Sequence, residues 1–239
     1  MKNLVRITCV VAAAIALFAV NASATIIADW TFETSYVSIT GTSTSKGPLS
    51  PEVGSGSATG VHQLSTTWSA VAGDGSAKSF SANQWTTGDY FQFQVSTVGY
   101  SGITVDWDQT SSNTGPSDFI LQYSTSGTSF TTFGGDLTVY NNNAGGGGGP
   151  AGRSFWSSAT YDSNYHYSIN LGSVVDNSAT VYFRVTDNNA LNPNGGIVAS
   201  GGTDRIDNFL VQGIPEPSTI MLVGFGLASC VLAIRRRRS

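Results

Sequence analysis

Two aspartates have the spacing for acid–base chemistry. Asp106 and Asp108 flank Trp107 in a segment that alternates like a β-strand. Both carboxylates would then project to the face opposite Trp107, about 7 Å apart, a separation that suits the two acids of an inverting glycoside hydrolase. Acids on the polar side of a strand usually form a solvated face, however, and catalytic pairs more often come from different strands. We therefore rank hydrolysis by this pair below non-catalytic functions.

A second pair of acids suits a metal ion. Glu33 follows the first predicted strand and Asp207 lies in the last one. If these end strands are neighbours, the two carboxylates meet near the side chains of Asp204 and Asn208. Hard cations such as Ca²⁺ prefer carboxylate and amide oxygens, and an ion there would tie the two ends together. We predict no required cofactor; a structural Ca²⁺ at Glu33 and Asp207 is the candidate ion.

Two loops are rich in residues that either bind ligands or form turns. Residues 187–203 gather five Asp and Asn side chains whose oxygens suit calcium or sugar, but the same residues are ordinary in turns, which is the favoured interpretation. Residues 141–152 contain five consecutive glycines. A phosphate-binding loop also needs a lysine and a following helix, so a surface linker is the better interpretation.

Histidine and cysteine offer little further chemistry. His62 lies in a Ser/Thr-rich stretch that we predict as a loop, and alternation places His166 on the solvent-facing side of its strand. Cys9 and Cys230 both fall in apolar terminal segments. Residues 25–213 therefore contain no disulfide, thiolate zinc site or cysteine nucleophile. Neither a Gly-x-Ser-x-Gly nor a His-Glu-x-x-His motif is present.

Period-two alternation predicts the elements that must position these residues. Short segments alternate apolar and polar residues between turns rich in Gly, Ser, Thr and Asn, and helical periodicity is almost absent. This pattern predicts an all-β fold, an antiparallel β-sandwich of jelly-roll type, with an eight-stranded closed barrel as the alternative. We expect the two end strands to pair and Trp30 and Trp107 to lie in the core. The predicted strands fall within residues 25–33, 89–97, 101–109, 118–125, 165–170, 179–187 and 204–213.

Charge is distributed unevenly along the chain. Residues 25–213 contain five Lys and Arg against fourteen Asp and Glu, a net charge of −9, whereas the other basic residues lie near the two ends. A body this acidic has no basic patch to neutralise phosphates, so we exclude nucleic acid as a partner. The same surplus of negative charge favours cations, with calcium the extracellular candidate.

The N-terminus has the parts of a secretory signal peptide. Two basic residues precede an apolar run at 7–20, and small residues follow it. We predict a signal peptide at residues 1–24 that signal peptidase cuts after Ala24, rather than an uncleaved helical anchor, because the run is short and ends in a good cleavage site. The remaining length to residue 213 suits one β-sandwich domain, 25–213.

The C-terminus carries a second apolar segment. Pro215, Glu216 and Pro217 precede an uncharged stretch of 17 residues at 218–234, near the lower limit of about 17–25 for a helical membrane span. The positive-inside rule keeps the basic tail 235–238 cytoplasmic and leaves Glu216 at the outer edge of the membrane. On hydrophobicity alone a permanent anchor would serve equally well. The basic tail consists of Arg235, Arg236, Arg237 and Arg238.

This order of elements resembles the PEP-CTERM sorting signal of Gram-negative bacteria, carried here by residues 214–239. The Pro-Glu-Pro tripeptide alone is a weak motif, but its order with the apolar span and the arginines, opposite a signal peptide, is specific. The resemblance implies processing by an exosortase, a membrane transpeptidase. It also implies transient passage through the inner membrane to the cell surface or the extracellular matrix, in bacteria many of which make exopolysaccharide.

The body more loosely resembles secreted jelly rolls of the carbohydrate-binding-module type. In calcium-containing members of that broad class, an acid after the first strand and an acid in the last strand hold the ion. Glu33 and Asp207 match those places by residue type and order. The resemblance implies a scaffold, and a scaffold does not fix a function.

Three functions remain open at this point. The first is an exported, non-enzymatic surface or matrix protein with a structural or adhesive role. The second is a carbohydrate-binding module for exopolysaccharide, which would stack sugar rings on the aromatic side chains predicted to be exposed at Trp68, Trp85 and Trp156. The third is a glycoside hydrolase, ranked last because no catalytic motif is present.

Overall fold

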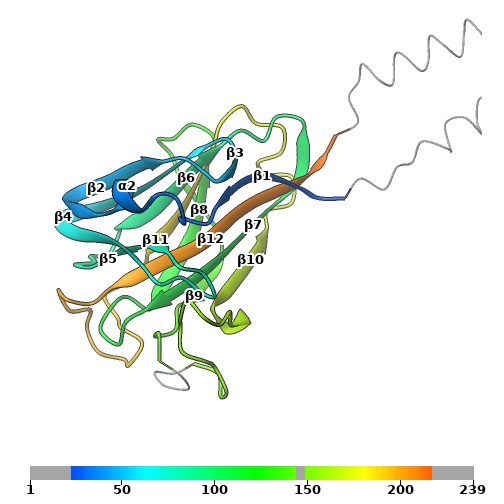
Figure 1. Cartoon of the computed structure of the whole chain (residues 1–239). Helices are drawn as coiled ribbons and strands as arrows, with labels where there is room; N and C mark the ends of the chain where they lie inside the picture. Colours follow the sequence, from blue (N-terminus) through cyan, green and yellow to red (C-terminus); the bar gives the residue numbers. More distant parts are fainter. Residues whose placement is uncertain (1–22, 144–148, 217–239) are drawn as a thin grey trace, which may run out of the picture.

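The computed structural model of the chain describes residues 23–143 and 149–216, which form an antiparallel β-sandwich (Figure 1). Its helical content in the described ranges is small, α2 (Tyr36–Ile39) and the 3₁₀ turn η1 (Ser163–Tyr165). The strands are β1 (Thr25–Trp30), β2 (Gly41–Leu49), β3 (Val53–Gly54), β4 (Ser57–Val71), β5 (Ser79–Ala82), β6 (Tyr90–Val95), β7 (Tyr100–Ser111), β8 (Asp118–Ser124), β9 (Thr131–Thr138), β10 (His166–Asn170), β11 (Val181–Asp187) and β12 (Asp204–Pro215).

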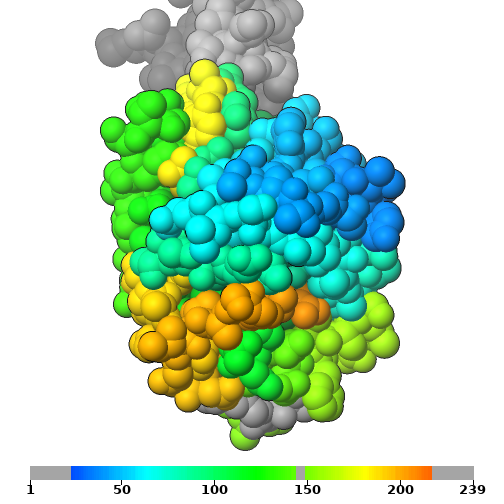
Figure 2. All heavy atoms as spheres, turned by 90° about the vertical axis from the view of Figure 1, so that its left-hand side faces the viewer, coloured from blue at the N-terminus to red at the C-terminus, as the bar shows by residue number. Residues whose placement is uncertain are grey.

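The strands follow one hydrogen-bonded path, in the order β10-β7-β12-β5-β4-β6-β11-β8-β9. The long strand β4 links the two halves of the sandwich, because Ser57–Val61 pair with β6 while Trp68–Val71 pair with β5. The path is open, with β10 and β9 at its ends, so the sandwich is confirmed over the closed barrel. Figure 2 shows β12 and the loop before it, in orange, between the cyan strands and the green segments.

The predicted pairing of the end strands is confirmed. β1 runs antiparallel to β12, with Thr25 opposite Gly213 and Trp30 opposite Phe209. The register of β12 against β7 shifts between Asp207 and Leu210, where Asn208 has a φ of 49°. Asparagine tolerates this left-handed conformation better than most residues. The irregularity changes which way the side chains around Asp207 point, which strict alternation does not reveal.

The core follows the alternation predicted for the strands. Phe91 and Phe93 are buried while the glutamines between and after them are half-buried. The Phe93 ring stacks on Phe209 with ring centroids 3.5 Å apart, which joins β6 to β12 across the interior. Trp30 and Trp107 are both fully buried, as predicted. Each large side chain taken wholly from water contributes about 1.5–3 kcal/mol, so this aromatic contact layer is a main source of stability.

One stretch predicted as a loop is a strand. His62 lies inside β4, and its exposed fraction is 3%. The Ser and Thr residues around it read as a loop by composition, but threonine also suits strands, and pairing with β2, β5 and β6 decides the outcome. The His62 ring packs against Trp68 and Trp85, with centroids 4.8 and 4.3 Å away. Burial lowers the pKa of His62 to about 4, so this histidine is neutral at pH 7.

Candidate functional site

The first candidate site is the end of the sandwich where β1 begins and β12 ends (Figure 1). Ala24, the predicted signal-cleavage residue, is exposed and immediately precedes β1. Pro215 is the last residue of β12 and lies opposite Tyr100 of β7. The backbone N–H of Glu216 donates to the Gly99 carbonyl at 2.8 Å. The sandwich therefore holds the chain in place up to the glutamate of the Pro-Glu-Pro element.

Glu216 is the last described residue, and it is exposed. Pro217, the predicted span at 218–234 and the basic tail at 235–238 lie outside the described residues, as does most of the predicted signal peptide. In the part of the chain that the structure describes, no helix has the length and apolar character needed to cross a membrane.

Comparison with protein families decides what this segment is. A family model described as "PEP-CTERM protein-sorting motif" matches residues 213–238. The chain carries a PEP-CTERM sorting motif. The PEP-CTERM match starts at Gly213, opposite the first residue of β1, so the motif overlaps the last three residues of β12. The sequence matches no curated protein.

Three solved structures are similar to the body at low sequence identity, with TM-scores of 0.40 or less. The CBM22-1 and GH10 modules of a Clostridium thermocellum xylanase complexed with xylohexaose are 12% identical, covering 81% of this chain and 29% of that one, with a TM-score of 0.40. The K1 adhesin domain of Lys-gingipain from Porphyromonas gingivalis is 13% identical, covering 62% and 83%, with a TM-score of 0.38. The CBM22-2 xylan-binding domain from Paenibacillus barcinonensis is 10% identical, covering 77% and 98%, with a TM-score of 0.37. Similarity at this level carries no information about a ligand.

The two acids of the predicted calcium pair both contact the loop at residues 74–78. Glu33 is exposed, and its Oε1 accepts from the backbone N–H of Lys78 at 2.8 Å. Asp207 is fully buried, and its Oδ2 accepts from Ser76 Oγ at 2.6 Å and from the backbone N–H of Asp74 at 3.0 Å. Both acids thus bind the segment that leads into β5. Within the described ranges, no three His, Cys, Asp or Glu side chains are grouped as a metal ion would require. A calcium site at this pair stays a prediction.

Asp204 does not join that region. It is fully buried, and its Oδ1 accepts from Gln109 Nε2 at 3.0 Å inside the sandwich. Burial raises the pKa of Asp204 well above its usual value, and the pKa of Asp207 to about 7. The expected gathering of the two aspartates near Glu33 is therefore wrong for Asp204, because Asp204 and Asp207 are three residues apart in a regular stretch of β12 and alternation places them on opposite faces.

The prediction of exposed tryptophans is wrong. Trp68, Trp85 and Trp156 have exposed fractions of 1%, 5% and 6%. Each indole N–H donates to a backbone carbonyl, of Ser43, Ala82 and Ala72 respectively. These side chains are packed and hydrogen-bonded as structural residues, because pairing and loop packing cover positions that the sequence places in polar surroundings. None of the three offers a face to a sugar ring.

Asp106 and Asp108 are not a solvated face either. Their exposed fractions are 8% and 2%. Asp108 Oδ1 lies 2.9 Å from His166 Nδ1, and its Oδ2 accepts from Asn208 Nδ2 at 2.8 Å. Asp106 Oδ2 accepts from Gln212 Nε2 at 2.9 Å. The register of β10 on β7 places His166 directly opposite Asp108, which neither segment reveals alone.

This carboxylate–histidine cluster has some elements of an acid–base site. Burial raises the pKa of Asp108, although its bonds to Asn208 and His166 oppose that rise. His166 Nε2 lies 3.8 Å from Asp106 Oδ1. No Ser, Thr or Tyr hydroxyl in the described residues is hydrogen-bonded to His166, so the group lacks an activated nucleophile there. Both aspartates are held by amide side chains, as structural carboxylates commonly are.

Side chains of the asparagine-rich loop at 187–203 form the local hydrogen bonds that are typical of turns. Asn192 Oδ1 accepts from the backbone N–H groups of Asn194 and Gly196, and its Nδ2 donates to the Ile197 carbonyl. Asn189 Nδ2 donates to Asp118 Oδ2. The favoured turn interpretation is thus supported at these residues.

Proposed function

We propose that this is an exported protein of a Gram-negative bacterium, sorted by an exosortase to the cell surface or extracellular matrix, with a non-catalytic body in a structural or adhesive role. One observation carries the proposal: the PEP-CTERM match begins within the last three residues of β12, and the described chain ends just past the sheet at the exposed Glu216. A short exit of this kind gives a membrane enzyme access to the motif while the body stays folded.

The position of Ala24 supports the same proposal. Because β1 and β12 are paired, the predicted signal-peptidase bond and the sorting motif lie at one end of the sandwich. In the predicted topology, two membrane segments would leave from that end, and the rest of the body would face away from the inner membrane. A cut after Ala24 and a cut beyond Glu216 would release an intact domain, since β1 begins at Thr25 and β12 ends at Pro215.

Intact-mass analysis of the protein from its native host, combined with cell fractionation, tests this function. The expected mass lacks residues 1–24 and the segment beyond the Pro-Glu-Pro element, and the protein lies outside the inner-membrane fraction. Replacing the motif acid, Glu216→Gln, should leave the full tail attached and hold the protein in the inner membrane. The matched control is Asp136→Asn, which alters an exposed acid far from the motif. A wild-type protein that keeps its tail in the membrane would show a permanent anchor instead.

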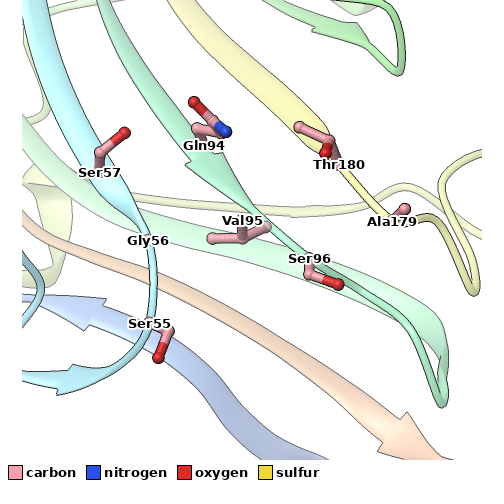
Figure 3. A pocket seen from close by; sticks show the side chains of 8 residues that line it. All are labelled: Ser55, Gly56, Ser57, Gln94, Val95, Ser96, Ala179 and Thr180. Atoms are coloured by element: carbon pink, nitrogen blue, oxygen red, sulfur yellow. The ribbon is translucent and has the colours of Figure 1, made fainter.

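A second candidate function is binding of exopolysaccharide, and a specific surface favours it. The outward residues of β6, β11 and β8 are mainly amides, hydroxyls and aromatic rings, with the charged Arg184 in the middle of β11, and such a face suits the hydroxyl-rich surface of a sugar polymer. An open hollow of about 360 Å³ beside it is lined by Ser57, Gln94 and Thr180 among others (Figure 3). Retention on polysaccharide beads, lost on Tyr182→Ala but not on Tyr36→Ala, would support this function.

Hydrolysis remains the least favoured function. The proposal of a non-enzymatic body is supported by the hydrogen bonds that hold Asp106 and Asp108 to Gln212 and Asn208. If the body were a glycosidase, Asp106→Asn or Asp108→Asn would abolish release of reducing sugar from a polysaccharide. We expect no release by the wild-type protein.

A further inference from the structure

Arg184 lies at the centre of a row of hydrogen-bond donors on the outer face of the sandwich. In β11 it alternates with Phe183 and Val185, which are buried in the core, so its side chain projects outward. The pairing register places it directly opposite Gln92 of β6 on one side and Gln122 of β8 on the other. Side chains opposite one another on adjacent strands stand about 5 Å apart, so these three can contact one ligand together.

The Arg184 guanidinium is fixed in one plane before any ligand arrives. Its Cζ lies 3.9 Å from the ring centroid of Tyr90 and 3.5 Å from that of Phe130. Its Nε donates to Gln92 Oε1 at 2.9 Å. Two rings and one hydrogen bond thus restrict a side chain that would otherwise lose rotamer freedom on binding. Stacking on its faces leaves the edge of the guanidinium for an in-plane ligand.

In residues 23–143 and 149–216, Arg184 has no acidic partner. Among the residues that the structure describes, no Asp or Glu forms an ion pair with Arg184. Burial lowers the pKa of Arg184, because the charge is partly withdrawn from water. A partly desolvated guanidinium without a counter-ion costs free energy that a bound carboxylate offsets through charge-assisted hydrogen bonds. The lack of a partner is notable because the body carries a surplus of acids.

The neighbouring amides also present donors. Gln92 Oε1 accepts from Arg184, and Gln122 Oε1 accepts from Thr186 Oγ1 at 3.0 Å, so both amide oxygens are occupied. The described contacts assign no acceptor to the amide Nε2 of either glutamine or to the terminal amino groups of Arg184. A row whose free groups are all donors requires a ligand rich in acceptors, and a carboxylate matches the guanidinium fork bidentately.

We propose that Arg184, with Gln92 and Gln122, binds the carboxylate of a uronic acid in an acidic polysaccharide. This inference rests on the second candidate function and names its class of ligand. The next row along the face holds Tyr182 opposite Gln94 and Ser124, and Gln94 also lines the hollow beside it (Figure 3). Hydroxyl and amide groups next to the charged row suit sugar hydroxyls of the same polymer, which an acidic peptide does not have.

Binding of the full-length protein in detergent to two forms of one polymer tests the proposal. The probes are polygalacturonate and the same polymer with its carboxyl groups reduced to alcohols. Measurements belong at about 0.15 M salt, where a Debye length of about 8 Å screens the repulsion between the acidic body and the polyanion. We expect polygalacturonate to bind and the reduced polymer to bind at least tenfold more weakly. Arg184→Gln should weaken polygalacturonate binding at least tenfold, and Arg184→Lys nearly as much, because lysine keeps the charge but loses the planar fork.

Lys46→Gln is the control variant, because it removes one positive charge from β2 and should leave binding unchanged. An unchanged melting temperature of Arg184→Gln shows that the variant is folded. If that variant unfolds, the binding of Arg184→Lys and the comparison of polygalacturonate with its reduced form still test the proposal. Equal binding of wild type and both Arg184 variants overturns the proposal. Binding to poly-glutamate or dextran sulfate as tight as to polygalacturonate also overturns the proposal, because the face would then recognise negative charge rather than a uronic acid. If the protein binds only the reduced polymer, the carboxylate site is rejected, but the proposed binding of a neutral polysaccharide is kept. The intact-mass experiment tests the proposed sorting function independently of either result.

Discussion

Thr25, the first residue of β1, lies directly opposite Gly213 near the end of β12. This one pair brings the predicted signal-cleavage residue Ala24 and the start of the PEP-CTERM match to the same end of the domain. Backbone hydrogen bonds within the domain pair β1 with β12, so this pairing does not depend on either terminal extension. An exported protein that loses both extensions benefits from this arrangement, since processing leaves its core unchanged.

Gly213 has no room for a side chain, and its replacement should loosen this end. A Cβ there would lie 2.7 Å from Ile103 Cδ1 and 3.1 Å from Tyr100 Cβ. We expect Gly213→Val to lower the free energy of unfolding by about 1–3 kcal/mol, as overpacking typically does, in urea unfolding of the protein. Gly135→Val is the control, because a Cβ at Gly135 meets nothing within 4 Å. Similar losses in both variants would contradict the packing argument.

We propose that Ca²⁺ binds at Glu33 and Asp207, although the described residues do not form a complete metal centre. Chelation should then lower the melting temperature, and Glu33→Gln should abolish that effect while leaving an exposed position otherwise intact. Asp207→Asn should do the same, but it also disturbs the bond from Ser76. Glu52→Gln is the control, since Glu52 accepts the Thr31 N–H instead. A melting curve that chelation does not move rejects the ion.

Asp187 should make stability depend on pH. Its exposed fraction is 1%, and burial raises its pKa to about 7, although the backbone N–H of Asn189 opposes that rise. A carboxyl whose pKa is higher in the folded than in the unfolded state favours folding while protonated. Its contribution is therefore present below about pH 4 and is lost as pH rises towards 7. We expect Asp187→Asn to raise the free energy of unfolding at pH 8 by on the order of 2–4 kcal/mol and to change it little at pH 4.

Asp74 and Asp207, whose pKa values burial also raises to about 7, add to the same slope in the wild type. The measurement is therefore the difference between wild type and Asp187→Asn in chemical unfolding across pH 4–8. Asp136→Asn, at an exposed acid, should show no such difference. A parallel pH profile for wild type and the Asp187 variant would mean that Asp187 is ionised and solvated when folded.

The buried tryptophans should act on stability rather than on ligand binding. Trp68→Ala removes a ring that packs on Phe80 at a centroid distance of 5.2 Å and should cost about 3–5 kcal/mol in unfolding free energy. Trp68→Phe should retain more of that stability, because it leaves a smaller cavity. A Trp68→Ala protein that is as stable as wild type but fails to bind polysaccharide would restore the stacking role rejected above.

The alternation of apolar and polar residues and the motifs at the two termini predict the fold class and the sorting signal of this protein. The sequence predicts the all-β class, the pairing of the end strands, the core positions of Trp30 and Trp107, and the sorting motif. These are local properties: period-two alternation reports which side of a strand is apolar, and the Pro-Glu-Pro element, apolar span and arginines are contiguous. The strand β4 escaped prediction because its Ser and Thr residues suit both loops and strands.

Tertiary structure alone decided which polar side chains meet and which aromatic ones are covered. His166 faces Asp108, and Arg184 lies between Gln92 and Gln122, only because the pairing register aligns strands far apart in the sequence. Trp156 is buried because its indole reaches the Ala72 carbonyl, 84 positions away. Burial and cross-strand contact are properties of the packed sheets. A single segment can show that a side chain suits an interior or a surface, but not which neighbour will cover it.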